Sequence, residues 1–170
     1  MKPSVARQLR AIGPLPGVVA IVVPALLVWR DGEAHVGWGA HGALAVPPVL
    51  LGAALIVLGF ALWLTTVRLF ARQGEGTLAP WDPPRKLVVE GPYRRFRHPM
   101  IAGVAAVLLG EAALLGSTSI AIWAAGFIAV NAVYLPLVEE PRLVRRFGAD
   151  YERYMREVPR WLPARRPHPG

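Results

Sequence analysis

Four stretches of the chain are uncharged or nearly so and long enough to predict membrane-crossing helices. They cover residues 13–29, 43–67, 99–115 and 120–138. The hydrocarbon core of a bilayer is about 30 Å thick, and a helix needs about 20 apolar residues to cross it. The first stretch could also be a signal peptide, but no clear small-residue cleavage site follows it, so we interpret it as an uncleaved span.

The third and fourth apolar stretches are separated only by Gly116, Ser117, Thr118 and Ser119. A connection this short predicts a tight antiparallel hairpin of two helices. His98 precedes the third stretch and the glutamates 139 and 140 follow the fourth, so a rise of about 1.5 Å per residue places both at the open end of the hairpin, at similar depth.

The C-terminal tail has apolar residues at helical spacing with arginines between them. The apolar positions are Leu143, Phe147, Tyr151, Tyr154 and Val158. This pattern is typical of an interfacial amphipathic helix, which could equally cover a polar pocket, and Gly148 would weaken or bend it. We expect the end of the chain, from Ala164 on, to be frayed. The predicted fold is all-α: one polytopic membrane domain over residues 1–170, with about four transmembrane helices and this C-terminal helix.

Composition agrees with a membrane location, because 54% of residues are hydrophobic and only 18% are charged. The formal net charge of +8 could serve nucleic acid, anionic lipid or an anionic ligand. In so apolar a chain we expect anionic lipid headgroups as partners and no nucleic acid. The chain has no cysteine, which excludes disulfides and thiolate chemistry, and we predict no metal site. The oligomeric state cannot be read from the sequence.

The basic residues predict the orientation in the membrane. All but one of the 19 lysines and arginines lie in the N-terminal tail, between residues 68 and 97, or after residue 141. The exception, Arg30, lies in the first connecting loop. By the positive-inside rule, both termini, the loop 71–98 and the tail 139–163 face the cytoplasm, and the protein is integral to the cytoplasmic membrane.

The open end of the hairpin therefore combines two kinds of group. Pro99 is expected at the start of the third helix, where free amides and nearby arginines suit a carboxylate or phosphate. Glu139 and Glu140 lie at a helix C-terminus, where the helix dipole disfavours them. Together these groups would suit a zwitterionic ligand. Alternatively, the two glutamates simply pair with arginines of the tail such as Arg142, Arg145 and Arg146.

Several motifs resemble one family. Residues 87–100 read LVVEGPYRRFRHPM and are similar to the signature L-V-x-x-G-P-Y-x-x-x-R-H-P-M of the isoprenylcysteine carboxyl methyltransferase-like and phospholipid methyltransferase enzymes. Residues 139–143 and 147–154 resemble the E-E-x-x-L and F-G-x-x-Y-x-x-Y elements of that family. Residues 158–163 resemble its closing V-P-R-x-x-P. The resemblance covers residues 60–163.

The resemblance implies an integral membrane methyltransferase that uses S-adenosylmethionine. The family's cofactor contacts correspond here to Tyr93, His98, Pro99, Met100, Ile101 and Glu139, with weaker matches at Leu78, Arg85, Lys86, Leu87 and Val88. The family often has tyrosine at the position of Ile101. No catalytic residue is assigned, although His98, Glu140 and Tyr154 are possible proton acceptors, since methyl transfer needs alignment more than a dedicated base.

The methyl acceptor is expected to be an amphiphile dissolved in the membrane, with a carboxyl, hydroxyl or amine as the methylated group. Members that esterify prenylcysteine have an arginine where this chain has Leu135, so the acceptor class stays open. Two alternatives also remain: an NADPH-dependent enzyme similar to sterol reductases, and a non-catalytic lipid-binding protein. The acidic pair favours the sulfonium cofactor over one that carries several phosphates.

Overall fold

The computed structural model describes residues 14–32, 34–73, 87–161, 163–164 and 168, and every regular element in these ranges is helical. The chain divides into two compact units. One comprises residues 15–61 and 102–130, and the other residues 1–14, 62–101 and 131–170. We refer to them as the hairpin unit and the terminal unit, and each is described by itself. Leu78, Arg85 and Lys86, three of the predicted cofactor contacts, lie outside the described residues.

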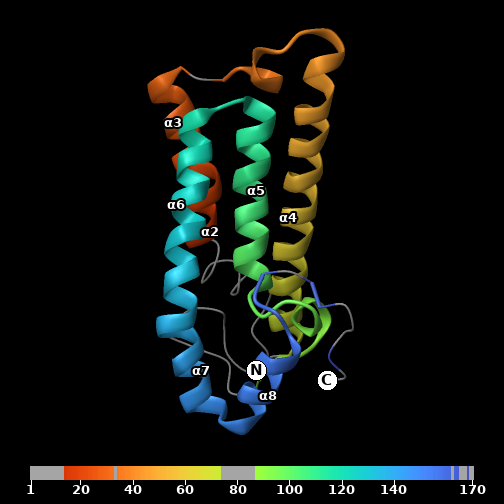
Figure 1. Cartoon of the computed structure of the whole chain (residues 1–170), viewed down its shortest axis with the longest axis vertical. Helices are drawn as coiled ribbons and strands as arrows, with labels where there is room; N and C mark the ends of the chain where they lie inside the picture. Colours follow the sequence, from red (N-terminus) through yellow and green to blue (C-terminus); the bar gives the residue numbers. More distant parts are fainter. Residues whose placement is uncertain (1–13, 33, 74–86, 162, 165–167, 169–170) are drawn as a thin grey trace. The chain divides into compact units, whose positions relative to one another are not determined.

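The hairpin unit contains the predicted turn between two helices. Helix α5 covers Pro99–Leu115 and helix α6 covers Thr118–Tyr134, so the connection is shorter than the four residues expected. Gly116 has φ +57°, a left-handed conformation that favours glycine, and an added Cβ there would collide with the carbonyl oxygen of His35. The two helices run antiparallel and side by side, which confirms the predicted hairpin (Figure 1).

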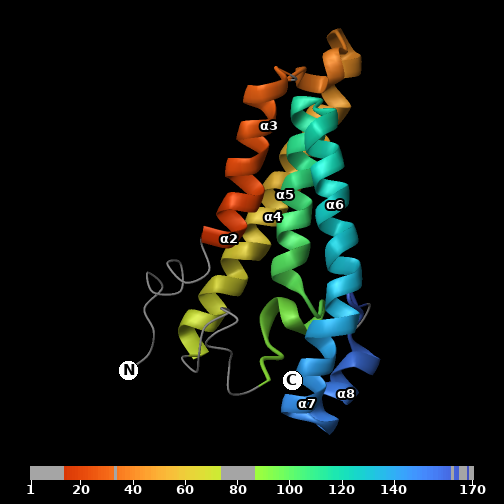
Figure 2. The same ribbon diagram turned by 90° about the vertical axis from the view of Figure 1, so that its left-hand side faces the viewer.

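The first apolar segment packs on this hairpin. It consists of α2 (Pro14–Gly17), the π-helical turn η1 (Val18–Val22) and α3 (Val23–Asp31). The Trp123 indole donates a hydrogen bond to the carbonyl oxygen of Val19 at 3.0 Å. Ala20 is buried with Val104, Leu108 and Ala124 in the core of the unit. Figure 2 shows α2 and α3 running beside the hairpin of α5 and α6. This segment therefore belongs to the fold of the hairpin unit.

Glycines allow α4 (Val46–Gln73) to approach α5 closely. The short 3-10 turns η2 (Val36–Gly39) and η3 (Gly42–Ala45) precede α4. An added Cβ on Gly59 would lie 2.5 Å from the carbonyl oxygen of Gly103, and one on Gly110 would lie 2.7 Å from that of Gly52. Small residues at helix contacts let backbones pack closely in membrane proteins, where dispersion replaces the hydrophobic effect.

Two helical stretches among the described residues are long and apolar enough to cross a bilayer, Gly42–Leu69 and Thr118–Phe147. Helix α5 is apolar but shorter. Many large apolar side chains on these helices are exposed, for example Leu58 at 66% and Ile122 at 68%, as expected for contact with lipid. Membrane crossing by the other two apolar segments stays a prediction.

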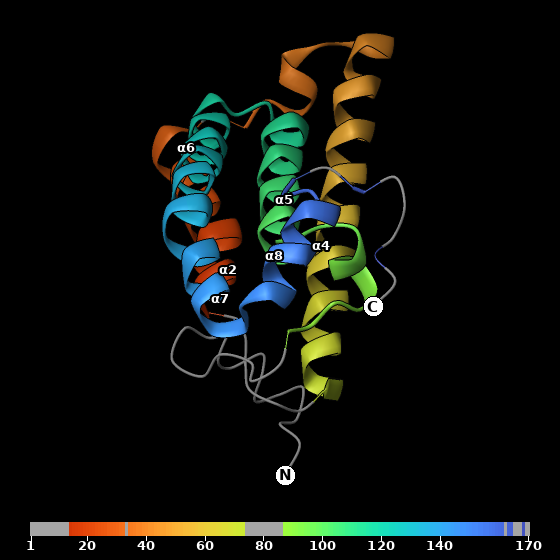
Figure 3. The same ribbon diagram turned by 60° about the horizontal axis from the view of Figure 1, so that its bottom comes forward.

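The terminal unit shows what the apolar stripe of the tail contacts. The tail forms two short helices, α7 (Glu140–Phe147) and α8 (Ala149–Glu157), with Gly148 between them at φ +57°, so the predicted bend is present (Figure 3). Tyr151, Tyr154 and Val158 are buried together, and they pack against Leu87, Val89, Leu143, Val144, Phe147 and Met155. The stripe therefore faces protein side chains, and an interfacial position of this helix pair stays a prediction.

Candidate functional site

The imidazole of His98 lies between the two glutamates. Its Nδ1 is 3.4 Å from Oε1 of Glu139, and its Nε2 is 3.4 Å from Oε1 of Glu140. His98 is buried, whereas the Glu139 side chain is 36% exposed. This confirms that the start of α5 and the acidic pair are neighbours, as the hairpin predicted.

Glu139 and Glu140 lie at a local irregularity in the helical segment that continues α6. After Tyr134 the α-helix widens into a π-helical turn, η5 (Leu135–Glu139), in which the amide of Glu140 donates to the carbonyl oxygen of Leu135. Pro141 has no amide hydrogen to donate, so the regular bonding pattern cannot continue through it. Single π turns change the register of a helix and are frequent at functional sites. Sequence reasoning expected an apolar span through Val138 and did not foresee this turn.

Glu140 is the buried centre of an ionic cluster. Its Oε1 accepts hydrogen bonds from Nη1 of Arg97 at 2.9 Å and from Nε of Arg160 at 2.8 Å, and its Oε2 accepts from Nη2 of Arg160 at 2.7 Å. Burial alone would raise the pKa of this carboxyl. The hydrogen bonds from Arg160 and His98, with the charges of Arg97 and Arg160, outweigh burial and lower the pKa to about 2.

Glu140 thus pairs with Arg97 and Arg160 rather than with the tail arginines suggested by the sequence. Arg142 and Arg145 are exposed on α7 instead. The bidentate contact with Arg160 is a strong form of ion pair, since a planar guanidinium matches a carboxylate. Glu140 is therefore a neutralised anchor, and Glu139 is the acidic group that stays accessible.

The protonation of His98 follows from its surroundings. Burial lowers the pKa of the imidazole, but hydrogen bonds with Glu139 and Glu140 and their charges outweigh it, and the pKa lies above its usual value of 6.5. In the imidazolium form both ring nitrogens donate, one to each carboxylate. Because each ring nitrogen faces a carboxylate oxygen, His98 is placed to donate hydrogen bonds at this site.

A short turn before His98 carries Tyr93. This 3-10 turn, η4, covers Gly91–Arg94, and Gly91 has φ +55°. The Tyr154 hydroxyl donates to the carbonyl oxygens of Tyr93 at 2.7 Å and Phe96 at 3.1 Å. Burial raises the pKa of Tyr93, and the negative charges that Tyr154 and Glu139 can carry add to the rise. Burial also raises the pKa of Tyr154, so this hydroxyl is a donor rather than a base.

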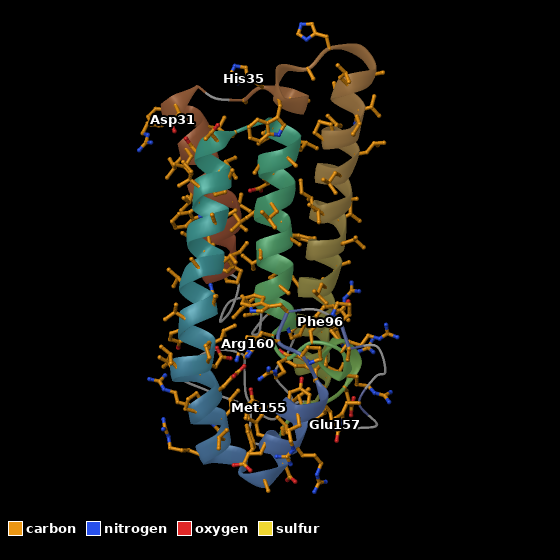
Figure 4. The ribbon with its side chains drawn as sticks, viewed as in Figure 1. Asp31, His35, Phe96, Met155, Glu157 and Arg160 are labelled. Atoms are coloured by element: carbon orange, nitrogen blue, oxygen red, sulfur yellow. The ribbon has the colours of Figure 1, made fainter. Side chains whose placement is uncertain are left out.

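The segment after α8 returns to the residues around η4. The amide of Arg97 donates to the carbonyl oxygen of Pro159 at 3.1 Å, and the amide of Ala164 donates to that of Arg95 at 2.9 Å. His168 bonds Arg94 in both directions, its amide donating at 3.0 Å and its carbonyl accepting from Nε at 2.5 Å. The expected fraying is therefore wrong for Ala164 and His168. Figure 4 shows the side chains of this unit, with Phe96 and Arg160 labelled.

Comparison with known proteins assigns the family. The family model described as phospholipid methyltransferase matches residues 48–150. The chain belongs to this family. The matched range includes His98, Glu139 and Glu140, and it ends before Tyr154 and Arg160. No curated protein and no solved structure matched the chain. Family membership and the two long apolar helices together support a membrane methyltransferase.

For this phospholipid methyltransferase family member, the described cofactor candidates fall into two groups. Around His98 the structure brings together Tyr93, Pro99 and Glu139, with Met100 and Ile101 in the first turn of α5. Leu87 instead packs against the tyrosine cluster of the tail, which is formed by Tyr151, Tyr154 and Val158. The next residue, Val88, is half-buried. Their role as cofactor contacts stays a prediction.

Sequence reasoning missed the role of two arginines in the ionic cluster and of one tyrosine in α8 that bonds to the turn η4. Arg97 and Arg160 neutralise Glu140, and Tyr154 binds the backbone around η4. The closing V-P-R element was visible in the sequence, but nothing in its spacing indicated Glu140 as the partner of Arg160. That pairing depends on how the chain returns after α8.

The site offers hydrogen-bond donors and an accessible carboxylate, which together have the chemistry that a zwitterionic ligand needs. The Nε of Arg97 is buried and has no hydrogen-bond partner among the residues that the structure describes. The first amides of α5 lack partners within the helix, as at any helix N-terminus. These donors suit a carboxylate. The Glu139 carboxylate is accessible and suits an ammonium or ribose hydroxyls, so both polarities of S-adenosylmethionine find a matching group.

Proposed function

We propose that this protein transfers a methyl group from S-adenosylmethionine to an amphiphile dissolved in the membrane. One observation carries the proposal beyond the family assignment: of two adjacent glutamates, Glu140 is neutralised by Arg97 and Arg160, while Glu139 remains 36% exposed beside the N-terminus of α5. A purely structural ion-pair cluster would have no need for a second, accessible carboxylate.

Different residues would bind different parts of the cofactor. The α5 amides and Arg97 Nε would bind the amino-acid carboxylate, and Glu139 would bind the ammonium or the ribose hydroxyls. Tyr93, which is half-buried and close enough to Glu139 to feel the charge of its carboxylate, would cover the bound ammonium or ribose. When bound, the cofactor supplies an electrophilic methyl group on a sulfonium. The protein's contribution is orientation and the exclusion of water.

The surroundings of His98 bear on the acceptor. His98 is held as a donor, Glu140 is neutralised, and Tyr154 donates to two carbonyls, so none of the three proton acceptors suggested by the sequence is suited to remove a proton. We infer that the acceptor presents a nucleophile that needs no base on the protein. It would be a carboxylate, which is ionised near neutral pH, or the neutral form of an amine that has lost its proton to water, rather than a hydroxyl. Leu135 is fully buried, which agrees with an acceptor headgroup that is held elsewhere.

The site would lie at the cytoplasmic face of the membrane. The proposal rests on the distribution of basic residues and on the exposed arginines of α7, which we expect to contact anionic lipid headgroups. These are Arg142, Arg145 and Arg146. Their helix packs its apolar side on the tyrosine cluster. Each arginine near an anionic surface contributes about 1 kcal/mol to membrane binding.

The first experiment is cofactor binding to the purified protein in lipid nanodiscs, measured by calorimetry with S-adenosylhomocysteine. We expect Glu139→Gln to weaken binding at least tenfold, because the variant loses a charge-assisted contact worth about 1.5–3 kcal/mol. Glu152→Gln, a neutralisation on the exposed side of α8, is the matched control and should bind like the wild type.

A titration with NADPH in the same nanodiscs separates the enzyme classes. Binding of NADPH in preference to S-adenosylhomocysteine, or equal affinity in wild type and Glu139→Gln, would overturn the proposal. Absence of binding to either compound would leave the lipid-binding alternative. Incubation with labelled S-adenosylmethionine and a total lipid extract would then identify the acceptor.

A further inference from the structure

Tyr154 connects two parts of the terminal unit that are far apart in sequence. Its side chain is 2% exposed, and its hydroxyl lies within hydrogen-bonding distance of the carbonyl oxygens of Tyr93 and Phe96. These carbonyls belong to the turn η4 and to the residue two before His98. Tyr154 therefore contacts the backbone that leads directly into the candidate site.

Within the turn itself, the backbone hydrogen bonds are short-range. The amide of Tyr93 donates to Glu90, and the amides of Arg95 and Phe96 both donate to Pro92. Such bonds close a turn but do not determine where it lies relative to α8. The Tyr154 hydroxyl links the turn directly to α8. The segment after α8 adds the bonds from the Arg97 amide to Pro159 and from the His168 amide to Arg94.

The ring of Tyr154 is itself held in place. It packs against Tyr151, with ring centroids 5.8 Å apart, and against His168 at 5.8 Å in an edge-on arrangement. Met155, labelled in Figure 4, and Val158 belong to the same cluster. Because the ring is fixed by packing, its hydroxyl is a rigid point of attachment for the turn.

We propose that Tyr154 is a positioning residue for the cofactor site, which holds the turn before α5 so that Tyr93 and His98 face Glu139. This inference rests on the proposed function. Tyr154 touches neither the cofactor nor the acceptor, and it acts through the backbone of residues 93–96. Removing its hydroxyl loosens the turn and weakens cofactor binding without removing any group that contacts the cofactor.

The neighbouring Tyr151 offers a matched control. It lies one helical turn earlier, in the same cluster and at the same 2% exposure. Its hydroxyl, however, has no hydrogen-bond partner within the described part of the chain. Tyr151→Phe and Tyr154→Phe remove the same atom from the same core. They differ in whether hydrogen bonds to the turn are lost.

The test compares both variants with the wild type in nanodiscs by amide hydrogen exchange, calorimetry with S-adenosylhomocysteine, and thermal unfolding. We expect Tyr154→Phe to speed exchange at the amides of Tyr93, Arg95 and Phe96 and to raise the Kd about tenfold, as for loss of a buried hydrogen bond. Tyr151→Phe should leave both within twofold of wild type. Tyr154→Phe keeps the ring, so the melting temperature shows whether the variant is folded.

Each other result overturns the inference. Equal effects of the two variants would indicate a general role of the core. Faster exchange with unchanged affinity, or weaker affinity with unchanged exchange, would separate the turn from cofactor binding. If the wild type itself binds no S-adenosylhomocysteine, the proposed function fails first, whereas a binding wild type with an unaffected Tyr154→Phe variant overturns the positioning role alone.

Discussion

The guanidinium of Arg160 forms two parallel hydrogen bonds with the carboxylate of Glu140, at 2.8 and 2.7 Å. Arg160 follows α8, the last helix among the described residues, and Glu140 begins α7. The pair closes the terminal unit around His98, because the same carboxylate also contacts Arg97 and the imidazole. Four predictions follow from this cluster and from the packing of the hairpin unit.

Glu140→Gln should destabilise the protein by about 3–5 kcal/mol, because removing one member of a buried ionic cluster leaves the other charges uncompensated. Unfolding in a denaturing detergent series would measure the loss. Glu152→Gln on α8 is exposed and should change stability by less than about 0.5 kcal/mol. Equal stabilities of the two variants would contradict the central role of Glu140.

The cluster should make stability depend on pH at both ends of a window. The pKa of Glu140 is lowered from 4.5 to about 2, so its contribution is fully present above pH 4.5 and is lost as the pH falls toward 2. The pKa of His98 is raised above 6.5, so its contribution is fully present below pH 6.5 and is lost as the pH rises through the folded-state value. As far as Glu140 and His98 determine it, the melting temperature of the protein should therefore be highest between about pH 4.5 and 6.5.

Two variants assign the loss of stability at low pH (the acid limb of the profile) and at high pH (the alkaline limb) to individual groups. Glu140→Gln should flatten the acid limb, and it should also reduce the alkaline limb, because His98 loses one of its carboxylate partners. His98→Gln should remove the alkaline limb and leave most of the acid one, since Arg97 and Arg160 still hold Glu140. An alkaline limb that persists unchanged in His98→Gln would assign it to another group.

Gly59→Ala should destabilise the hairpin unit by about 1–3 kcal/mol, because the new Cβ would lie 2.5 Å from the carbonyl oxygen of Gly103 and α4 and α5 would have to separate. Gly126→Ala in α6 is the control, since no atom lies within 4 Å of the added Cβ. Alanine is the better helix former, so this control should be neutral or slightly stabilising. Thermal unfolding in nanodiscs distinguishes the two; similar losses would mean that α4 and α5 are not closely packed.

Trp123→Phe should weaken the attachment of the first apolar segment to the hairpin. The variant keeps most of the ring packing and removes the hydrogen bond to Val19, at a cost of about 1 kcal/mol. Cross-linking between α6 and the first segment, or proteolysis of that segment, would detect the change. Trp29→Phe, at a side chain that is 82% exposed, should have no such effect.

Much of the fold followed from local signals. The long apolar stretches, the short connection at Gly116 and Pro99 at a helix start predicted α5 with its observed bounds. They also predicted α4 and α6, with ends that differ from the observed ones by a few residues. The bend at Gly148 was also predicted. These features depend on residues near one another in the chain, for which hydrophobicity and backbone freedom are sufficient.

The candidate site was predicted only in part. The hairpin argument brought His98 to Glu139 and Glu140 through chain geometry alone. Which glutamate is neutralised, and by which arginines, was not predicted, because many arginines lie close in sequence and only one arrangement brings Arg160 to Glu140. The π turn that presents the pair was missed as well, since a single extra residue in a helical turn leaves no periodic signal.

By itself, the sequence determined that the chain is helical and apolar, where its helices turn back, and which residues meet at the end of the hairpin. These properties come from hydrophobic periodicity and from the length of one connection, which local physics settles. Only the tertiary structure decided that the tail's apolar stripe packs on the segment before His98, that Tyr154 holds the turn carrying Tyr93, and that Glu139 is the carboxylate left accessible. Those outcomes depend on contacts between residues some 20 to 60 positions apart, and their energies are comparable among the many arginines and tyrosines that could have made them.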